Sequence, residues 1–364
     1  MCPNFKETFL QLIRLSIRTE EAVTSLENLN DTDWEALQRM AEKQNLLGVM
    51  LDGIDYLPKD LRPPKKVIIQ NVGRLIQEEV DVATQQYSAE QMALLLHHHG
   101  IRTYVLKGMV VSECYPNPQR RRSSDMDCYL LPENSKLNAW EAGNLIMKEN
   151  GFEVRNDYYK NSTILMPGVT VENHRFFTPF RGNEQLKNFE RYLQSQMEHS
   201  NSTVSDDNRF EGTWLFRPPV MVTALFLIEH AYSHFLHEGL TWRMVLDWTL
   251  FSQKHQEEID YSELEKRIDE FGFRRFYESF TQIGSYMLGE LAPSDLHPSD
   301  IRMIEDIWAP LDTHKTVEGI RGKMALAGNT WRARWKYRYY TNMTWIKALW
   351  IQAWGVLFEK NPEL

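Results

Sequence analysis

The spacing of apolar residues changes at Gly100, and this change constrains the fold more than any other feature of the sequence. Before Gly100 the apolar side chains recur every three or four residues, as Phe9 and Leu12 do, which is the spacing of an amphipathic helix. The pattern predicts helices over 5–99, the last of them a long helix over about 65–99. Glycine tolerates the left-handed conformation found just past helix ends, so Gly100 is expected to end that helix.

Beyond Gly100 the pattern becomes that of short strands. Runs that alternate or are rich in β-branched residues cover 103–106, 125–131, 162–166 and 169–175. The last two flank Pro167-Gly168, a turn signal that predicts a hairpin. A helical pattern over 135–150 separates the second strand from the hairpin, and the stretch 183–208 is polar. The order of elements predicts a small α/β core.

Helical spacing returns at Val220 and continues nearly to the end of the chain. We therefore divide the sequence into an N-terminal helical region over 1–99, an α/β core over 100–215 and a C-terminal helical domain over 216–364. The 364 residues suffice for two or three packed units. A content of 42% hydrophobic and 25% charged residues is ordinary for a globular protein. The predicted fold class is α+β, a small mixed β-sheet core flanked by helical regions.

Charge and cysteine content exclude several classes of protein. A formal net charge of −9 argues against a surface that binds nucleic acid over its whole extent, because such binding depends on Lys and Arg. The cysteines Cys2, Cys114 and Cys128 form neither a disulfide framework nor a CxxC zinc cluster. The first residues lack the pattern of a signal peptide, and the sequence has no stretch of ~20 apolar residues. These features predict a cytoplasmic protein.

Two aspartates on the second predicted strand carry the main chemical signal. Asp125 and Asp127 are two residues apart, and this spacing places both carboxylates on the same face of a strand. Neighbouring carboxylates repel each other unless a cation lies between them, and Mg²⁺ is the usual cation where phosphates are also bound. The pair predicts a metal site, although an isolated DxD pair is more often a solvated strand edge.

Two further segments predict partners for this pair. Lys107-Gly108 follows the first predicted strand and precedes an apparent helix over 109–114. Glycine lets the backbone approach a ligand, and a helix N-terminus attracts anions, so we expect a phosphate there. On the last predicted strand, alternation sends Glu172 and His174 to one face. Glu172 can therefore complete a set of three carboxylates.

Together these segments resemble a nucleotidyltransferase family of the DNA polymerase beta-like superfamily. Its members carry a Leu-Leu-Lys-Gly turn, a Tyr-Pro, an Arg-x-x-Ser-Asp-x-Asp motif, and an acidic residue just before a His on a valine-rich strand. The matching segments are Val105-Leu106-Lys107-Gly108, Tyr115-Pro116, Arg121-Arg122-Ser123-Ser124-Asp125-Met126-Asp127 and Glu172-Asn173-His174. The chain departs from the family at Glu172, where Asp is more usual, and at Arg175, where Trp is frequent.

The resemblance implies a nucleotidyltransferase-type core and an enzyme that uses Mg²⁺ or Mn²⁺. Such an enzyme moves a nucleotidyl group from a nucleoside triphosphate, such as ATP, to an acceptor, here unidentified, by a two-metal mechanism. The implied catalytic residues and metal ligands are Asp125, Asp127 and Glu172. The implied nucleotide- or phosphate-binding residues are Lys107, Gly108, Arg121 and Ser124. Similarity to two helical segments of the family adds the candidate cleft residues His230, His234 and Asp247, and His174 of the strand motif is a fourth.

Alternative interpretations stay open beside this one. The same fold also suits a catalytically inactive nucleotide-binding or regulatory protein. A peripheral membrane or nucleic-acid adaptor is suggested by 331–340, which mixes four cations with aromatic residues. A terminal helix docked on the body explains that segment better. His230, His234 and His237 share one helix face, but without an HExxH motif a zinc site is the weaker interpretation.

Overall fold

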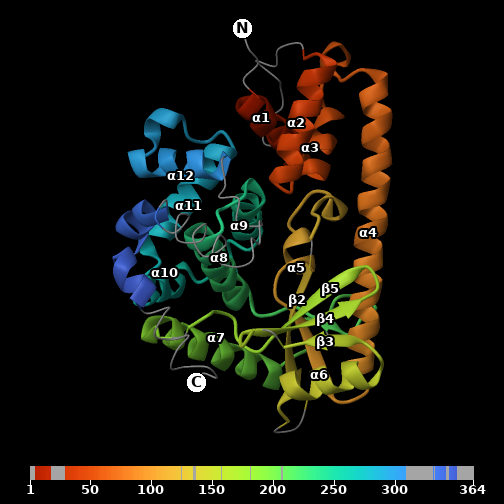
Figure 1. Ribbon diagram of the computed structural model, residues 1–364, viewed down its shortest axis with the longest axis vertical. Helices are drawn as coiled ribbons and strands as arrows, with labels where there is room; N and C mark the ends of the chain where they lie inside the picture. The colour runs from red at the N-terminus through yellow and green to blue at the C-terminus, as the bar shows by residue number, and fades with distance from the viewer. Residues whose placement is uncertain are drawn as a thin grey trace, which may run out of the picture.

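Helices surround a six-stranded mixed sheet (Figure 1), so the predicted α+β class is confirmed. The computed structural model describes residues 5–17, 29–123, 125–133, 137–156, 158–180, 182–205, 208–308, 331, 333–341 and 344–350. Three helices open the fold: α1 (Phe5–Ile17), α2 (Asp31–Lys43) and α3 (Leu47–Ile54).

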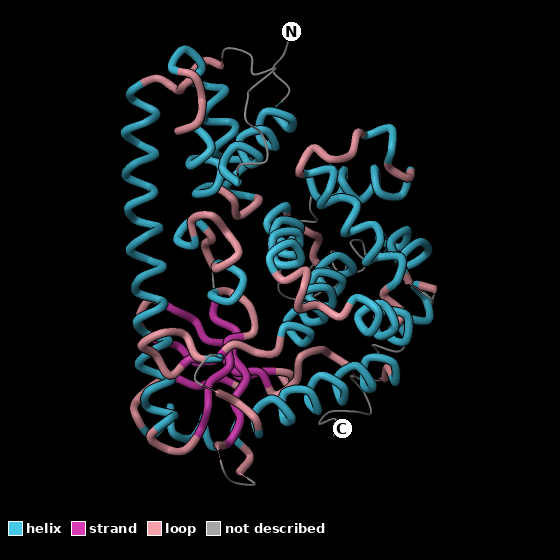
Figure 2. Tube along the Cα trace, turned by 180° about the vertical axis from the view of Figure 1, so that it is seen from behind, coloured by secondary structure: helices cyan, strands magenta, loops and turns pink. Residues whose placement is uncertain are grey.

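The long helix α4 (Lys65–His97) connects this first group to the sheet. It runs along one edge of the molecule in both views (Figures 1 and 2). The helix ends as predicted, with Gly100 at a φ of 71°, a conformation that disfavours any residue with a side chain. One long helix thus holds the N-terminal helices and the sheet together.

The sheet has the strand order β3-β4-β5-β2-β1-β6. Its strands are β1 (Ile101–Val105), β2 (Asp125–Pro132), β3 (Glu153–Arg155), β4 (Asn161–Met166), β5 (Val169–His174) and β6 (Leu215–Phe216). The predicted hairpin is confirmed, because β4 and β5 pair antiparallel around Gly168, whose φ is 73°. Strand β2 lies between antiparallel β1 and parallel β5. The two carboxylate-bearing strands are therefore neighbours in the centre of the sheet.

Helix α6 (Ala139–Glu149) covers one face of β2. Met126, Cys128 and Leu130 are buried, as the alternation predicts for the side facing the core. The contact is close, because a Cβ added to Gly143 of α6 would lie 2.3 Å from Leu130 Cδ1. The side chains of the two aspartates of β2 therefore project from the opposite face of the sheet.

The polar stretch 183–208, for which the sequence pattern predicts no element, contains a helix. It forms α7 (Glu184–Ser202), which begins at the side-chain cap of Asn183. A narrow apolar stripe of Phe189, Leu193 and Met197, all buried, suffices to fix the helix on the body. The polar residues around the stripe conceal this periodicity in the sequence.

Beyond Val220 the described residues are mainly helical, as predicted. Its helices are α8 (Val220–His237), α9 (Trp242–Lys254), α10 (Tyr261–Phe271), α11 (Arg274–Met287) and α12 (Pro298–Trp308). Within the segment 331–340, Lys336 is fully buried, 2.6 Å from Asp306. This contact supports a docked segment rather than a free cationic surface. The described helices include none that is both long enough and apolar enough to cross a membrane. The three-part division of the chain stays a prediction.

Candidate functional site

The register between β2 and β5 brings the carboxylates together. Asp127 is the partner of Glu172, and Asp125 is the partner of Thr170. Asp127, Glu172 and His174 each offer a ligand atom, and these atoms lie within 4.8 Å of one another. The parallel pairing of the two strands thus brings two of the three predicted carboxylates, Asp127 and Glu172, together with His174, whereas Asp125 is outside this group.

Asp127 is buried between two cationic groups. Its Oδ1 lies 2.9 Å from His174 Nε2, and its Oδ2 lies 3.0 Å from Lys107 Nζ. Burial alone would raise the pKa of Asp127, but the charge of Lys107 and the hydrogen bond from His174 hold it well below its usual range. The carboxylate is therefore ionised at neutral pH. Apart from this ion pair with Lys107, Oδ2 has no hydrogen-bond partner within the described part of the chain.

His174 acts on Asp127 as a hydrogen-bond donor. Its Nδ1 faces the carbonyl oxygen of Phe176 at 3.1 Å, while Nε2 faces Asp127. A ring nitrogen must carry a proton to donate to either oxygen, so this geometry favours the doubly protonated imidazolium. Burial and the charge of Lys160 lower the pKa of His174, yet the hydrogen bonds to Asp127 and Glu172 outweigh them and raise it. In this arrangement His174 positions a carboxylate and offers no lone pair to a metal.

The two outer carboxylates have different surroundings. The hydrogen bond with His174 lowers the pKa of Glu172, whose side chain is 34% exposed and thus accessible from solvent. Burial and the neighbouring charge of Asp127 raise the pKa of Asp125. An added cation would offset both effects at Asp125, because it favours the ionised form of a carboxyl group.

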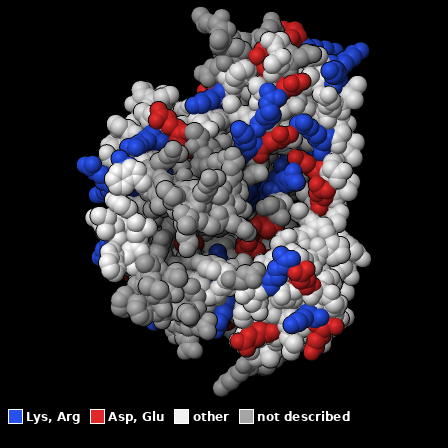
Figure 3. Space-filling model, viewed as in Figure 1, with Lys and Arg blue, Asp and Glu red and all other residues white. Residues whose placement is uncertain are grey.

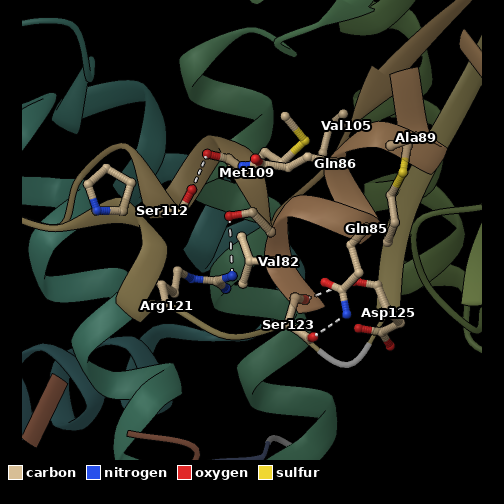
Figure 4. A pocket seen from close by; sticks show the side chains of 13 residues that line it. Val82, Gln85, Gln86, Ala89, Val105, Met109, Ser112, Arg121, Ser123 and Asp125 are labelled. Atoms are coloured by element: carbon tan, nitrogen blue, oxygen red, sulfur yellow. Dashed lines mark hydrogen bonds between the residues drawn. The ribbon is translucent and has the colours of Figure 1, made fainter. Parts of the chain in front are cut away.

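Asp125 also lines a pocket between α4 and the turn at Gly108 (Figure 4). In that view Gln85 Nε2 donates to the Ser123 carbonyl, and Ser123 Oγ donates to the Asp125 carbonyl. The pocket holds about 40 Å³, room for a few water molecules. A nucleotide would have to extend beyond it, over the carboxylates. Ser124 lies outside the described residues.

The Lys107-Gly108 turn has the predicted backbone, but its helix is shorter than expected. Gly108 has a φ of 59°, and α5 (Met109–Ser112) is a single turn rather than a helix over 109–114. Val110 N–H donates to the Lys107 carbonyl, so this donor is already used. A single helical turn has only a small dipole. A phosphate at this position would therefore depend mainly on the ammonium group of Lys107.

Arg121 and Asp247 form a buried pair behind the site. Arg121 Nε and Nη2 each donate to Asp247 at 2.7 Å, and Nη1 donates to the Gly108 carbonyl. Tyr115 Oη adds a hydrogen bond of 2.7 Å to the same carboxylate. The pair links the Lys107-Gly108 turn to helix α9. A direct contact between Arg121 and a phosphate, as the resemblance implies, would compete with these bonds.

The histidines of α8 face the carboxylates across the site. His230 Nε2 lies 3.1 Å from Lys107 Nζ. Burial, with the charges of Lys107 and His234, holds the pKa of His230 well below its usual range. His234 instead pairs with Glu238 at 2.9 Å. Among the described residues, no histidine of α8 joins a group with metal-ligand geometry, so the zinc interpretation gains no support.

Two cations beside the site have no recognisable signal in the sequence. Arg243 of α9 lowers the pKa of Asp125 through its charge, and its Nη1 lies 3.7 Å from Asp247. Lys160, just before β4, acts on Glu172 and His174 in the same way. Neither occurs in the motifs, because each reaches the site from a segment distant in sequence. The site is locally rich in cations although the chain is acidic.

Glu190 of α7 fixes the loop that follows β5. Its Oε2 accepts the backbone N–H groups of Phe177 and Thr178 at 2.8 and 3.0 Å, and the side chain is fully buried. Burial, with the charge of Glu229 adding to it, raises the pKa of Glu190 to about 7. Helix α7 thus helps to position Glu172 and His174, because it holds the loop that follows them.

This pKa predicts a loss of stability as the pH rises from 4.5 to 7. In that window Glu190 loses its proton in the unfolded chain but keeps it in the folded protein, so the free energy of unfolding falls, by roughly 3 kcal/mol at most. Chemical denaturation across this range should give a shallower fall for Glu190→Gln. Glu184→Gln, exposed on the same helix, should follow the wild type. Parallel curves for wild type and Glu190→Gln would contradict the assignment.

Comparison with known proteins supports the resemblance noted in the sequence. A sequence model of the family described as "Uncharacterised nucleotidyltransferase" matches residues 30–289, which is more than half of the chain. No match to a curated protein or to a solved structure was found. The matched region contains the carboxylates of β2 and β5, the Lys107-Gly108 turn and the histidines of α8. The chain belongs to the uncharacterised nucleotidyltransferase family.

Proposed function

We propose that this enzyme transfers a nucleotidyl group from a nucleoside triphosphate to an acceptor, with Mg²⁺ or Mn²⁺ held by Asp125, Asp127 and Glu172. The observation that carries the proposal is the pairing of Asp127 with Glu172 across the central strands. The donors fit such an ion, because the ammonium group of Lys107 is the only partner that the described residues offer to the buried Asp127 Oδ2, and carboxylate oxygens are the ligands of hard divalent cations.

The cations around the carboxylates suit the phosphates of the substrate. Lys107 lies 3.0 Å from Asp127 and can turn toward a phosphate once another cation compensates that carboxylate. Arg243 has a buried Nε without a hydrogen-bond partner in the described structure. A guanidinium with a spare donor beside the carboxylates is well suited to a phosphate oxygen. We therefore assign the triphosphate contacts to Lys107 and Arg243 ahead of Arg121.

The reaction requires one bond to form and one to break. The acceptor oxygen attacks the α-phosphorus, the bond between that phosphorus and the α–β bridging oxygen breaks, and pyrophosphate leaves. Glu172, ionised and accessible, takes the proton of the acceptor hydroxyl. The imidazolium of His174 keeps Asp127 oriented. When bound, the divalent ions neutralise the phosphate charge and lower the pKa of the acceptor hydroxyl.

A nucleotide-binding protein without activity is the second candidate, and one observation favours it. The ammonium group of Lys107 lies against Asp127, where it partly supplies the compensation that a metal would give. A protein that keeps this ion pair in the presence of nucleotide would bind the nucleotide without transferring it.

Calorimetric titration tests the proposed site. Each nucleoside triphosphate is titrated with Mg²⁺, with Mn²⁺ and without a divalent ion, into wild type and Asp125→Ala/Asp127→Ala. We expect metal-dependent binding of at least one triphosphate by the wild type and a loss of more than tenfold in the variant. Circular dichroism confirms that the variant is folded. Equal binding by both proteins, or binding independent of metal, would overturn the proposal.

A further inference from the structure

Helix α4 presents a continuous apolar stripe on its outer face. The stripe consists of Ile69, Val72, Ile76, Val80, Ala83 and Tyr87, all exposed. Ile69 is 72% exposed and Ile76 56%, so the described residues leave these side chains uncovered. In Figure 3 the edge over α4 is largely free of charged side chains. Isolated exposed apolar residues are ordinary on protein surfaces, but a contiguous patch marks an interaction site.

The stripe follows the helix axis closely. Tyr87 follows Ile69 by 18 residues, which is five turns of 3.6 residues, so both side chains project in the same direction. The buried residues of α4, among them Glu78 and Ala89, lie on the opposite face toward the body. The helix is therefore apolar on two sides, although the described fold uses only one of them.

We infer that this stripe is the contact between two copies of the chain, with their α4 helices packed antiparallel. The charges beside the stripe favour this direction, since Lys65 stands at its start and Glu90 just past its end. A two-fold axis near Glu78 places Ile69 against Tyr87, and Lys65 close to Glu90, of the second copy. A parallel pairing would instead place like charges together, and it would align the two helix dipoles unfavourably.

The size of the stripe predicts a weak dimer. At 1.5 Å per residue it is about 27 Å long, so one pair of helices offers a contact area in the smallest class of specific interfaces. A micromolar dissociation constant is therefore expected. The stripe lies on the side of α4 away from the sheet, so the inference does not depend on the proposed enzymatic function.

Sedimentation velocity over a range of micromolar concentrations tests this inference on the full chain. Wild type should shift toward the dimer as its concentration rises, whereas Ile76→Glu/Val80→Glu should stay monomeric over the same range. Leu145→Glu is the matched control, because Leu145 of α6 is equally exposed, at 56%. That variant should dimerise like the wild type. Circular dichroism verifies that each variant is folded.

A charge exchange tests the antiparallel direction. Lys65→Glu alone and Glu90→Lys alone should each weaken the dimer severalfold, and the double variant should restore it. A monomeric wild type at all concentrations would overturn the inference, as would a dimer unaffected by Ile76→Glu/Val80→Glu. Cosedimentation of a monomeric wild type with phosphatidylcholine vesicles would also overturn it and assign the stripe to a lipid surface.

Discussion

Replacing Asp127 by Asn is expected to reduce nucleotidyl transfer by about a hundredfold to a thousandfold, the range seen when one preorganised electrostatic group of a transition state is removed. Asp127 is the most buried of the three carboxylates and is kept ionised by Lys107 and His174. Asn has nearly the same shape but no charge, and its amide presents a donor where the site needs an acceptor. The effect should therefore fall on the rate of the chemical step.

The measurement follows nucleoside triphosphates labelled at the α-phosphate, incubated with Mg²⁺ or Mn²⁺ and a desalted cell extract that supplies acceptors. Wild type should place label on an acceptor and release pyrophosphate, and Asp127→Asn should do neither at a measurable rate. Asp60→Asn, at an exposed aspartate of the short 3-10 helix Lys59–Leu61, controls for the chemistry of the substitution. Transfer by Asp127→Asn within tenfold of the wild type would rule out the assigned role.

The sequence predicts the role of Glu172 but not the protonation state of His174. Strand alternation correctly predicts that both share a face with Thr170, and the resemblance supplies the acidic role of Glu172. The protonation of His174 depends on the Phe176 carbonyl at its Nδ1, a contact whose geometry is set by the conformation of the loop after β5. No spacing rule predicts it, because the loop is fixed by Glu190 of a helix that the sequence conceals.

The long helix and the four longer strands were predictable because each has a clear period, unlike the short strands β3 and β6, which the sequence patterns did not predict. The pairing of β2 with β5 was not, since strand order depends on which faces the helices cover, and the sequence of a strand does not state its neighbour. For the same reason, the sequence does not predict that Arg243 and Lys160 lie beside the site. Local sequence patterns identify the carboxylates. The cations that balance their charge come from segments distant in sequence and lie beside them only in the folded chain.

The buried pair of Arg121 and Asp247 is expected to matter more for stability than for substrate binding. Asp247→Ala should lower the free energy of unfolding by about 3–5 kcal/mol, because it leaves a guanidinium buried without its counterion. Asp269→Ala is the control. Asp269 pairs with Arg274 through two similar bonds of 2.7 and 2.6 Å, but at the surface. Its loss should cost below about 1 kcal/mol.

A double substitution then separates the structural role of Arg121 from phosphate binding. Arg121→Met/Asp247→Leu removes both charges together and fills the space with apolar atoms, so it should recover most of the stability lost in Asp247→Ala. If Lys107 and Arg243 hold the triphosphate, the recovered protein should bind nucleotide within about threefold of the wild type, whereas Arg243→Met should weaken binding by tenfold or more. A stable double variant that no longer binds nucleotide would return Arg121 to the phosphate site. That result would support the phosphate-binding role that the family motif implies for Arg121. It would also mean that Arg121 breaks its hydrogen bonds to Asp247 when it binds the substrate.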